Sequence, residues 1–262
     1  MMNNPVREHA GANATVSSGP EVEVRTARGA MLYDGSRIEQ PGGGEIFERS
    51  AWRARGALEE QPGGRGTVAF VREGPRRWVL RHYRRGGLVA RFLDDAYLWT
   101  GAVRTRSFAE WRLLRQLAQW QMPVPRAVAA RYTRSGLVYR ADLITEELPT
   151  RLTLAQSLAA APLGAARWRA VGRCIGRLHA RGVRHADLNA HNLLLGEGNA
   201  VYVVDFDRGR VVRRGRWERR VVARLRRSLA KVSRGLPADR FGEADWRELL
   251  QGVSDCASST SS

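Results

Sequence analysis

Alternating apolar and polar positions, rich in β-branched and aromatic residues, predict four strands in the first half of the chain. These strands span residues 67–72, 78–83, 128–133 and 136–145. Gly74-Pro75 marks a turn between the first two, so they are expected to form a hairpin. Between the two pairs, apolar residues at helical spacing predict a helix over 108–120, which ends before Pro123. A short helix is also expected between Phe47 and Leu58.

The second half of the chain is dominated by helical periodicity. Apolar side chains fall on one face of a predicted helix over 165–181, and Gly182 follows it as a C-terminal cap. Two short strands are predicted over 193–195 and 200–204, on either side of a glycine-containing turn. A strongly basic helix is predicted over 217–229.

The order of these elements indicates an α+β protein of two lobes with a cleft between them. We predict a β-rich N-lobe over residues 26–146 and a reduced, α-rich C-lobe over residues 147–250. Residues 1–25 are rich in Asn, Ser, Gly and Ala and are expected to form a disordered lead. Residues 251–262 are expected to form a disordered tail.

The composition narrows the class of protein. The chain has 262 residues, of which 43% are hydrophobic and 27% charged, which excludes a membrane-spanning bundle and a wholly disordered chain. The net charge of +18 favours a polyanionic partner, and Lys231 is the only lysine. Two cysteines without metal spacing fit a reducing compartment, and the first residues show no secretory signal, so we expect a cytoplasmic protein.

Two segments of the second half carry the most informative chemistry. They are residues 185–192 (HADLNAHN) and 205–207 (DFD). The pattern H-x-D-L-x-x-x-N followed by D-F matches the catalytic and metal-binding loops of the protein-kinase fold. Phosphoryl transfer needs a carboxylate that orients the attacking hydroxyl, and Asp187 is the candidate. Asn192 and Asp205 offer oxygen ligands for Mg²⁺, so the joint pattern predicts a kinase-like enzyme that uses ATP and Mg²⁺.

Parts of the first half are candidates for nucleotide binding. Gly63, Gly64 and Gly66 precede the first strand of the hairpin, where their backbone N–H groups can approach phosphates, although most such turns are only turns. At the other end of this half, the backbone of the linker around Glu147 is expected to bind adenine.

Arg81 occupies the strand position at which protein kinases carry a phosphate-binding lysine. A guanidinium group can pair with Glu110 on the following helix and still donate hydrogen bonds to phosphate oxygens. The alternative for Glu110 is a capping box, in which Ser107 would be the N-cap residue.

Several blocks of sequence resemble one family of sugar kinases. They are residues 78–88 (WVLRHYRRGGL), 104–106 (RTR), 110–111 (EW), 123–125 (PVP), 139–143 (YRADL), 185–192 and 205–207. Over roughly residues 28–235 the chain is similar to the 3-deoxy-D-manno-octulosonic acid (Kdo) kinases of lipopolysaccharide inner-core assembly. Arg81 and Asp207 depart from protein kinases but match the pattern of this family.

The resemblance implies ATP-dependent phosphorylation of the 4-hydroxyl of a Kdo residue on Kdo-lipid A, at the cytoplasmic face of the inner membrane. Few residues follow Asp205 in this sequence, which also favours a small molecule or a lipid-linked sugar over a protein acceptor. No protein partner is inferred. Some arginines are candidates to contact the anionic acceptor or an anionic membrane surface, although a biased genome composition explains most of them. These are Arg84, Arg85, Arg91, Arg104, Arg106 and those within 213–227.

Three other interpretations stay open. The same fold serves kinases of core heptose or aminoglycosides, which acceptor choice would separate from a Kdo kinase. A basic nucleic-acid-binding protein would account for the positive charge, but it would not need a catalytic carboxylate with metal ligands. The aromatic residues also do not interleave with the basic runs, as a surface for stacking bases would require. A pseudokinase would keep the motifs without turnover. His185 and His191 are expected to hydrogen-bond backbone near the catalytic loop rather than bind a metal.

Overall fold

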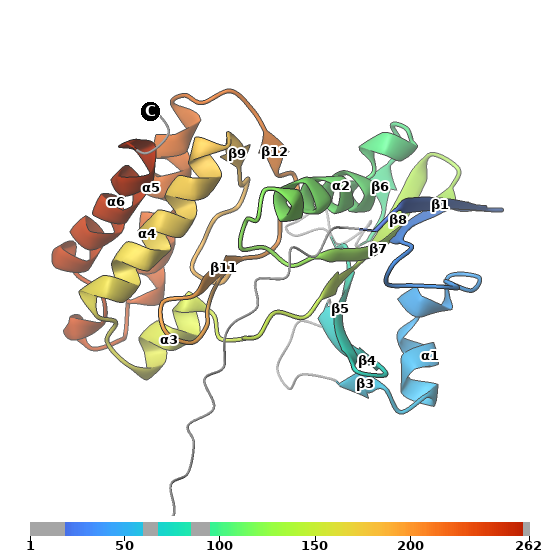
Figure 1. Cartoon of the computed structure of the whole chain (residues 1–262), viewed down its shortest axis with the longest axis horizontal. Coiled ribbons are helices and arrows are strands. Elements are labelled where there is room, and N and C mark those ends of the chain that lie inside the picture. The colour runs from blue at the N-terminus through green and yellow to red at the C-terminus, as the bar shows by residue number, and fades with distance from the viewer. Residues whose placement is uncertain (1–18, 60–67, 85–94, 259–262) are drawn as a thin grey trace, which may run out of the picture.

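The computed structural model describes residues 19–59, 68–84 and 95–258, which form a strand-rich lobe and a helical lobe (Figure 1). The predicted phosphate-binding turn of Gly63, Gly64 and Gly66 lies outside the described residues, as do Arg85 and Arg91. The first eighteen residues of the predicted disordered lead also lie outside them.

The N-lobe is built on one antiparallel sheet. Its strands are β1 (Glu21–Thr26), β2 (Gly29–Asp34), β3 (Leu58–Glu59), β4 (Val68–Glu73), β5 (Arg76–His82), β6 (Tyr97–Leu98), β7 (Ala127–Ser135) and β8 (Val138–Glu146). Their order is β1-β2-β7-β8-β5-β4-β3, and β6 also pairs with β8. Strands β4, β5, β7 and β8 confirm the four strands predicted from the sequence.

The sequence did not predict β1 and β2, and the expected disordered lead is wrong for Glu21–Arg25. This segment pairs with β2 from Glu21 opposite Asp34 to Arg25 opposite Ala30. Strand β1 is mostly exposed and carries only two apolar side chains, so its own pattern is weak. Backbone pairing to the buried strand β2 therefore orders it.

Helices cover both faces of the sheet. On one face lies α2 (Arg106–Gln119), which follows the short 3₁₀ helix η3 (Ala102–Arg104) and confirms the predicted helix. On the other face lie η1 (Glu45–Phe47) and α1 (Arg49–Ala54), where a short helix was expected. Trp52 packs edge-on against Trp78, with ring centroids 6.1 Å apart. The sheet thus contributes to two hydrophobic clusters, one on each side.

The C-lobe consists mainly of helices, which lie side by side at the left of Figure 1. They are α3 (Leu154–Ala160), α4 (Ala165–Ala180), α5 (Trp217–Val232), the 3₁₀ helix η4 (Ala238–Arg240) and α6 (Glu243–Ser258). Two antiparallel strand pairs accompany them: β9 (Val183–Arg184) with β12 (Arg210–Val211), and β10 (Leu193–Leu195) with β11 (Val201–Val203). The helices predicted over 165–181 and 217–229 and the short hairpin are confirmed.

The expected disordered tail from residue 251 is wrong as far as Ser258, because α6 continues to that residue. The helix packs closely on α4 through glycines. A Cβ atom on Gly252 would lie 2.1 Å from the carbonyl oxygen of Arg169, and one on Gly172 would lie 2.0 Å from that of Leu249. A glycine inside a helix weakens it locally, but here it lets two backbones approach. Tertiary packing therefore orders a helix that the sequence did not predict, and this helix continues past the predicted end of the C-lobe at residue 250.

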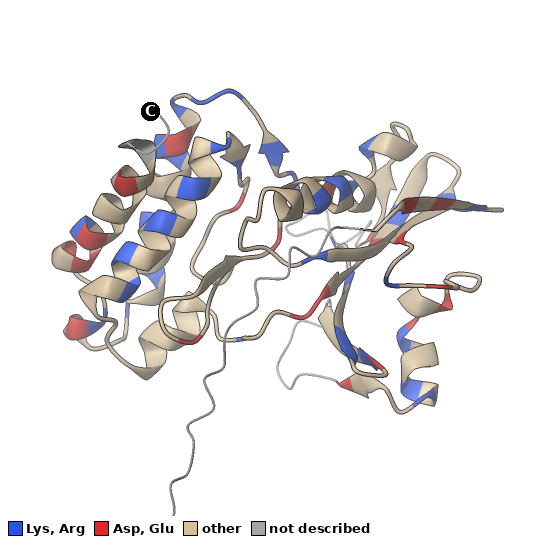
Figure 2. Ribbon diagram, in the orientation of Figure 1, with Lys and Arg blue, Asp and Glu red and all other residues tan. Residues whose placement is uncertain are grey.

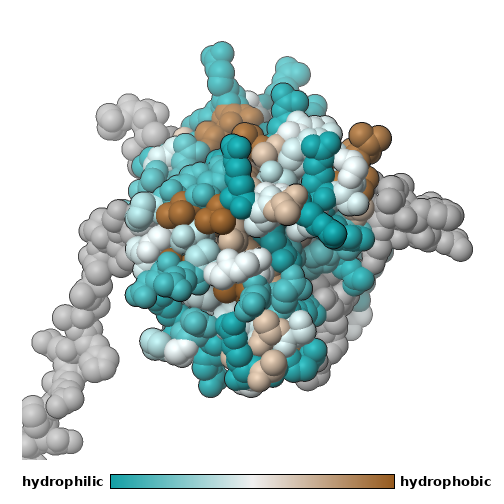
Figure 3. All heavy atoms as spheres, turned by 90° about the vertical axis from the view of Figure 1, so that its right-hand side faces the viewer, coloured by the Kyte–Doolittle hydropathy of each residue, from teal (hydrophilic) through white to brown (hydrophobic). Residues whose placement is uncertain are grey.

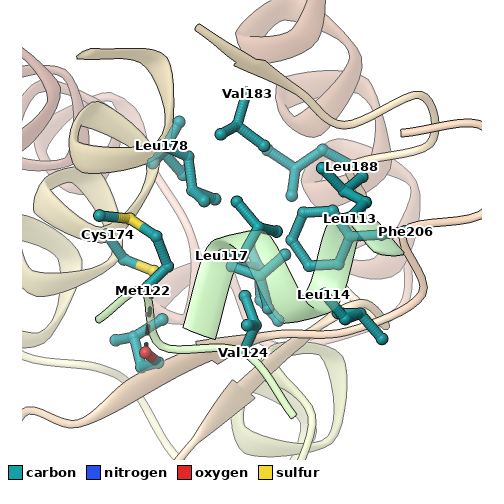
Figure 4. Close-up of a cluster of buried hydrophobic side chains, with 14 of the residues drawn as sticks. Leu113, Leu114, Leu117, Met122, Val124, Cys174, Leu178, Val183, Leu188 and Phe206 are labelled. Atoms are coloured by element: carbon teal, nitrogen blue, oxygen red, sulfur yellow. Dashed lines mark hydrogen bonds between the residues drawn. The ribbon is translucent and has the colours of Figure 1, made fainter. Parts of the chain in front are cut away.

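Helix α2 connects the two lobes through a shared hydrophobic cluster (Figure 4). Its Leu113, Leu114 and Leu117 lie beside Leu188 and Phe206 of the C-lobe. All five side chains are buried. Because close-packed side chains resist sliding, this contact fixes α2, and every residue it carries, against the C-lobe.

Candidate active site

A cleft of about 330 Å³ opens where the lobes meet. Five residues predicted from the sequence line it: Arg81, Glu110, Glu147, Asn192 and Asp205. The rest of the lining is largely apolar and includes Val68, Phe70, Val79, Leu143, Leu148 and Leu194. An apolar cleft with a few converging charged groups is typical of a ligand-binding site.

Glu110 is the centre of the charged end of the cleft. Its side chain, only 2% exposed, forms an ion pair with Arg81. One carboxylate oxygen accepts a hydrogen bond from the hydroxyl of Tyr83 at 2.7 Å, and the other accepts from the backbone N–H of Phe206 at 3.0 Å. Arg81 also forms an ion pair with Asp205. Glu110 therefore joins β5 and α2 to the segment after β11.

The capping-box alternative for Glu110 is wrong. The N-cap residue of α2 is Thr105, and it makes no side-chain capping hydrogen bond. Ser107 instead donates from its hydroxyl to the carbonyl oxygen of Arg131 at 2.8 Å. The carboxylate of Glu110 instead pairs with Arg81, on the side of the helix that faces the cleft. The position of Glu110 three residues after Ser107 therefore does not reflect helix capping.

Burial and pairing act in opposite directions on these groups. Burial raises the pKa of Glu110, and the Arg81 guanidinium opposes that shift. Burial also works against the charge on Arg81, but the carboxylates of Glu110 and Asp205 hold the pKa of its guanidinium well above the ordinary value. Burial disfavours ionisation of Asp205 as well, yet Arg81 lowers its pKa. Arg81 thus stays cationic and keeps Asp205 ionised.

The hairpin of β10 and β11 brings the two predicted metal ligands together. Leu193 pairs with Val203, and the backbone N–H of Val204 donates to the carbonyl oxygen of Asn192 at 3.0 Å. Asp205 then adopts a left-handed backbone conformation with φ of 62°. A non-glycine residue held there is under strain that the surrounding contacts must sustain, which occurs most often at functional positions.

The donor atoms fit Mg²⁺. The side-chain N–H of Asn192 donates to the carbonyl oxygen of Asp187 at 2.9 Å, which leaves the amide oxygen of Asn192 for a ligand. That oxygen and the carboxylate of Asp205 are hard donors of the kind Mg²⁺ prefers. Within the described residues there is no cluster of three or more His, Cys, Asp or Glu. Mg²⁺ commonly takes only one or two protein ligands, however, and completes its shell with phosphate and water.

His185 organises the loop that carries Asp187. Its Nδ1 accepts a hydrogen bond from the backbone N–H of Asp187 at 3.1 Å, so its Nε2 carries the proton and donates to the carbonyl oxygen of Val204 at 3.0 Å. Burial lowers the pKa of His185, which favours this neutral form. His185 therefore hydrogen-bonds backbone, as expected. His191 is exposed, and its backbone N–H donates to the side chain of Asn189 at 2.8 Å.

Comparison with known proteins identifies the family. The model of the lipopolysaccharide kinase (Kdo/WaaP) family matches residues 49–252. A protein of Xanthomonas campestris pv. campestris (strain B100), named 3-deoxy-D-manno-octulosonic acid kinase, is 47% identical over 84% of this chain and 87% of its own length. Proteins of the same name are 44% identical in Xanthomonas oryzae pv. oryzae (strain PXO99A), over 90% and 94%, and 43% identical in Stenotrophomonas maltophilia (strain K279a), over 78% and 81%.

The chain belongs to the lipopolysaccharide kinase (Kdo/WaaP) family. The expected family is thus confirmed, and with it the α+β, kinase-like fold of two lobes. Membership of a kinase family favours an enzyme over a basic nucleic-acid-binding protein.

In this Kdo/WaaP family member, two contacts at the site go beyond what the sequence predicted. Arg106 at the start of α2 donates to a carboxylate oxygen of Asp207 at 2.6 Å. The other carboxylate oxygen of Asp207 is buried and has no hydrogen-bond partner among the described residues. Arg224 of α5 forms an ion pair with Asp187. The sequence marks both arginines only as members of basic runs, and spacing alone does not reveal their partners.

The side chain of Glu147 is occupied by arginines. It accepts from Nε of Arg77 at 2.7 Å and from Nε of Arg151 at 2.5 Å, while its backbone N–H donates to the carbonyl oxygen of Arg77 at 2.9 Å. These contacts hold the linker after β8 against the sheet at the apolar end of the cleft. The adjacent Leu148 lines the cleft directly.

Proposed function

We propose that this protein transfers the terminal phosphoryl group of ATP to a Kdo residue in lipopolysaccharide biosynthesis, with the 4-hydroxyl of Kdo on lipid A or its precursor as the acceptor. Family membership and the names of its relatives support the reaction class. The observation that carries the proposal is structural. Arg81, Glu110 and Asp205 converge in a largely apolar cleft that Asn192, from the loop of Asp187, also lines.

Each residue then has a role in binding or proton transfer. The apolar end of the cleft and the linker backbone around Glu147 bind adenine, and Arg81, oriented by Glu110, binds the phosphates. We propose that the backbone N–H groups of Gly63, Gly64 and Gly66, which lie outside the described residues, also bind the phosphates. Mg²⁺, held by Asn192 and Asp205, would neutralise charge on the phosphate oxygens.

Asp187 orients the sugar hydroxyl and accepts its proton. As the hydroxyl oxygen bonds to the terminal phosphorus, the bond from that phosphorus to the departing ADP oxygen breaks. The backbone of Asp187 is fixed by His185 and Asn192, which keeps its carboxylate near the metal ligands. Accurate placement of this kind is the main source of acceleration in phosphoryl transfer.

We also propose that the protein works at the cytoplasmic face of the inner membrane, because the acceptor is a lipid. Among the described residues, no helix is long and apolar enough to cross a bilayer. However, Leu98, Val103 and Leu137 are 67%, 68% and 79% exposed in neighbouring segments of the N-lobe. The backbone N–H of Trp99 joins two of these segments by donating to the carbonyl oxygen of Leu137 at 2.9 Å. The exposed Arg104 adds positive charge. Figure 3 shows apolar side chains among hydrophilic ones on this end of the molecule.

The reaction is tested by incubating the purified protein with ATP, Mg²⁺ and a Kdo-bearing lipid A precursor and detecting added phosphate by mass spectrometry. Core heptose and aminoglycoside acceptors, assayed in parallel, distinguish the other kinases of this fold. Asp187→Ala should lower turnover by a factor of about 10² to 10⁴. A normal rate in this variant, or phosphate transfer to the other acceptors alone, would contradict the proposal.

Membrane association is tested by sedimentation with vesicles of anionic or neutral lipid. We expect more protein to sediment with the anionic vesicles, and less after Leu98→Ser combined with Leu137→Ser. Equal sedimentation of both proteins would show that these leucines do not contact lipid.

A further inference from the structure

The carboxylate of Asp187 is already occupied by a positive charge. Arg224 reaches it from α5, and this ion pair is open to solvent, with side chains 51% and 53% exposed. Exposed pairs of this kind contribute little to stability, because solvent screens the charges and long side chains lose entropy when fixed. Arg224 is therefore free to exchange its partner for another anion at small cost.

The flank of α5 that faces the catalytic loop is basic. Its position is fixed by Ser228, whose hydroxyl oxygen accepts from the backbone N–H of Ala190 at 3.1 Å. Arg220 lies four residues before Arg224 and Lys231 seven residues after it, so all three share that flank. Arg220 and Lys231 are exposed and form no ion pair within the part of the chain that the structure describes. Figure 2 shows basic residues repeated along the helices of this lobe.

We propose that Arg220, Arg224 and Lys231 form a binding site for the anionic groups of the acceptor, and that Arg224 binds the carboxylate of the sugar acid. This inference rests on the proposed function, since it assigns the acceptor side of the same reaction. A planar guanidinium group matches a carboxylate in bidentate geometry, which suits Arg224 to this ligand. The two neighbouring cations favour an acceptor that carries further negative charge.

The exchange of partners couples recognition to catalysis. While Arg224 is paired with Asp187, its guanidinium group occupies the carboxylate that the attacking hydroxyl must reach. An acceptor carboxylate that binds Arg224 removes this pairing and leaves Asp187 free to take the proton of the attacking hydroxyl. A sugar that lacks a carboxylate does not displace Arg224 from Asp187. Such a sugar should therefore bind more weakly and also react more slowly.

The test compares a Kdo acceptor having a free carboxylate with its methyl ester, using the full chain. We expect the wild type to have a kcat/KM about tenfold or more higher for the acid. Arg224→Gln should remove most of this preference by raising KM for the acid, while KM for ATP stays within about twofold. On the ester, Arg224→Gln should match or exceed the wild type, because Asp187 has lost its competing partner. Arg224→Lys should restore part of the preference.

A matched control is Arg247→Gln, which changes an exposed arginine on α6 and should leave both acceptors unaffected. Thermal unfolding of each variant checks folding, and Arg220→Gln combined with Lys231→Gln provides a second route if Arg224→Gln unfolds. Equal loss on acid and ester in Arg224→Gln, or an unchanged preference for the acid, would overturn the inference while leaving the kinase intact. No transfer to either acceptor by the wild type would refute the proposed function and this inference together.

Discussion

The candidate site contains two arginine–aspartate contacts that differ in their surroundings, one lining the cleft and one on the loop beside it. Arg81 is 19% exposed and pairs both with Asp205, which is 42% exposed, and with Glu110, which is only 2% exposed; the side chains of Arg224 and Asp187 are 51% and 53% exposed. The first contact joins β5, α2 and the segment after β11 through Glu110, and the last two are held by the hydrophobic cluster that the lobes share. The second joins one helix to a surface loop. The fold itself therefore organises the part of the site to which we assign the nucleotide, and the part to which we assign the acceptor is left for a ligand to complete.

Removing the central carboxylate should have the largest effect. Glu110→Ala leaves Arg81, the hydroxyl of Tyr83 and the N–H of Phe206 without their shared partner. We expect a loss of about 3 kcal/mol in the free energy of unfolding, together with loss of kinase activity. Urea unfolding of Glu110→Ala and Glu110→Gln measures this, and the amide should retain some of the hydrogen bonding. Wild-type stability in both variants would show that the buried group is not structural.

A buried histidine outside the cleft should lower the stability of the protein in acid, and this effect must be separated from the pH dependence of the cleft. Burial of His179 on α4 lowers its pKa from 6.5 to about 4, and its ring packs edge-on against Trp217 at 5.1 Å. Between these values the unfolded chain binds a proton that the folded protein does not, so stability falls as the pH falls below 6.5. We expect a loss of ~3 kcal/mol between pH 7 and pH 4 from this group.

His179→Gln removes this pH-dependent contribution to stability, and urea unfolding of the variant and the wild type at pH 7 and pH 4 measures the difference. If the variant and the wild type lost equal stability on acidification, His179 would not be the group responsible. The variant then allows the pH dependence of activity to be assigned to the cleft carboxylates.

The contact of Arg106 with Asp207 tests whether the buried ion pairing of the site extends beyond Arg81 and Glu110. Burial raises the pKa of Asp207, and Arg106 is the main charge that opposes this shift. Arg106→Met should cost about 2 kcal/mol of stability, because Asp207 is left without its partner. Adding Asp207→Asn should recover part of the loss. A double-mutant cycle measured by thermal unfolding checks this, and strictly additive effects would show that the two residues do not interact.

The smallest effect on stability is expected on the open side. Arg224→Gln should change the free energy of unfolding by less than about 1 kcal/mol, because the pair is exposed. Urea unfolding of Arg224→Gln and Glu110→Ala in the same series compares how much the two contacts contribute to stability. A loss as large as that of Glu110→Ala would mean that Arg224 holds the fold together and is not free to exchange partners.

Local patterns alone predicted most strands and helices and the residues of the catalytic loops, because alternation and helical spacing report which side chains are buried. They placed Arg81, Glu110, Asn192 and Asp205 correctly on their elements. They missed β1 and α6, where order comes from partners distant in the sequence. Strand β1 has only two apolar side chains, and α6 contains a glycine. Read without the elements they pack against, both features indicate irregular structure.

The sequence by itself predicted the reaction class of this protein, since the residue types and spacing of 185–192 and 205–207 match the catalytic and metal-binding loops of the kinase fold, and the family of its relatives confirms that class. Only the tertiary structure decided which charges meet. It decided for the predicted pair of Glu110 with Arg81 over the capping alternative, and it set Arg224 against Asp187, which the sequence did not predict. The reason is physical: ion pairs form between groups that packing brings within a few ångströms, and here the partners are separated by dozens of residues along the chain.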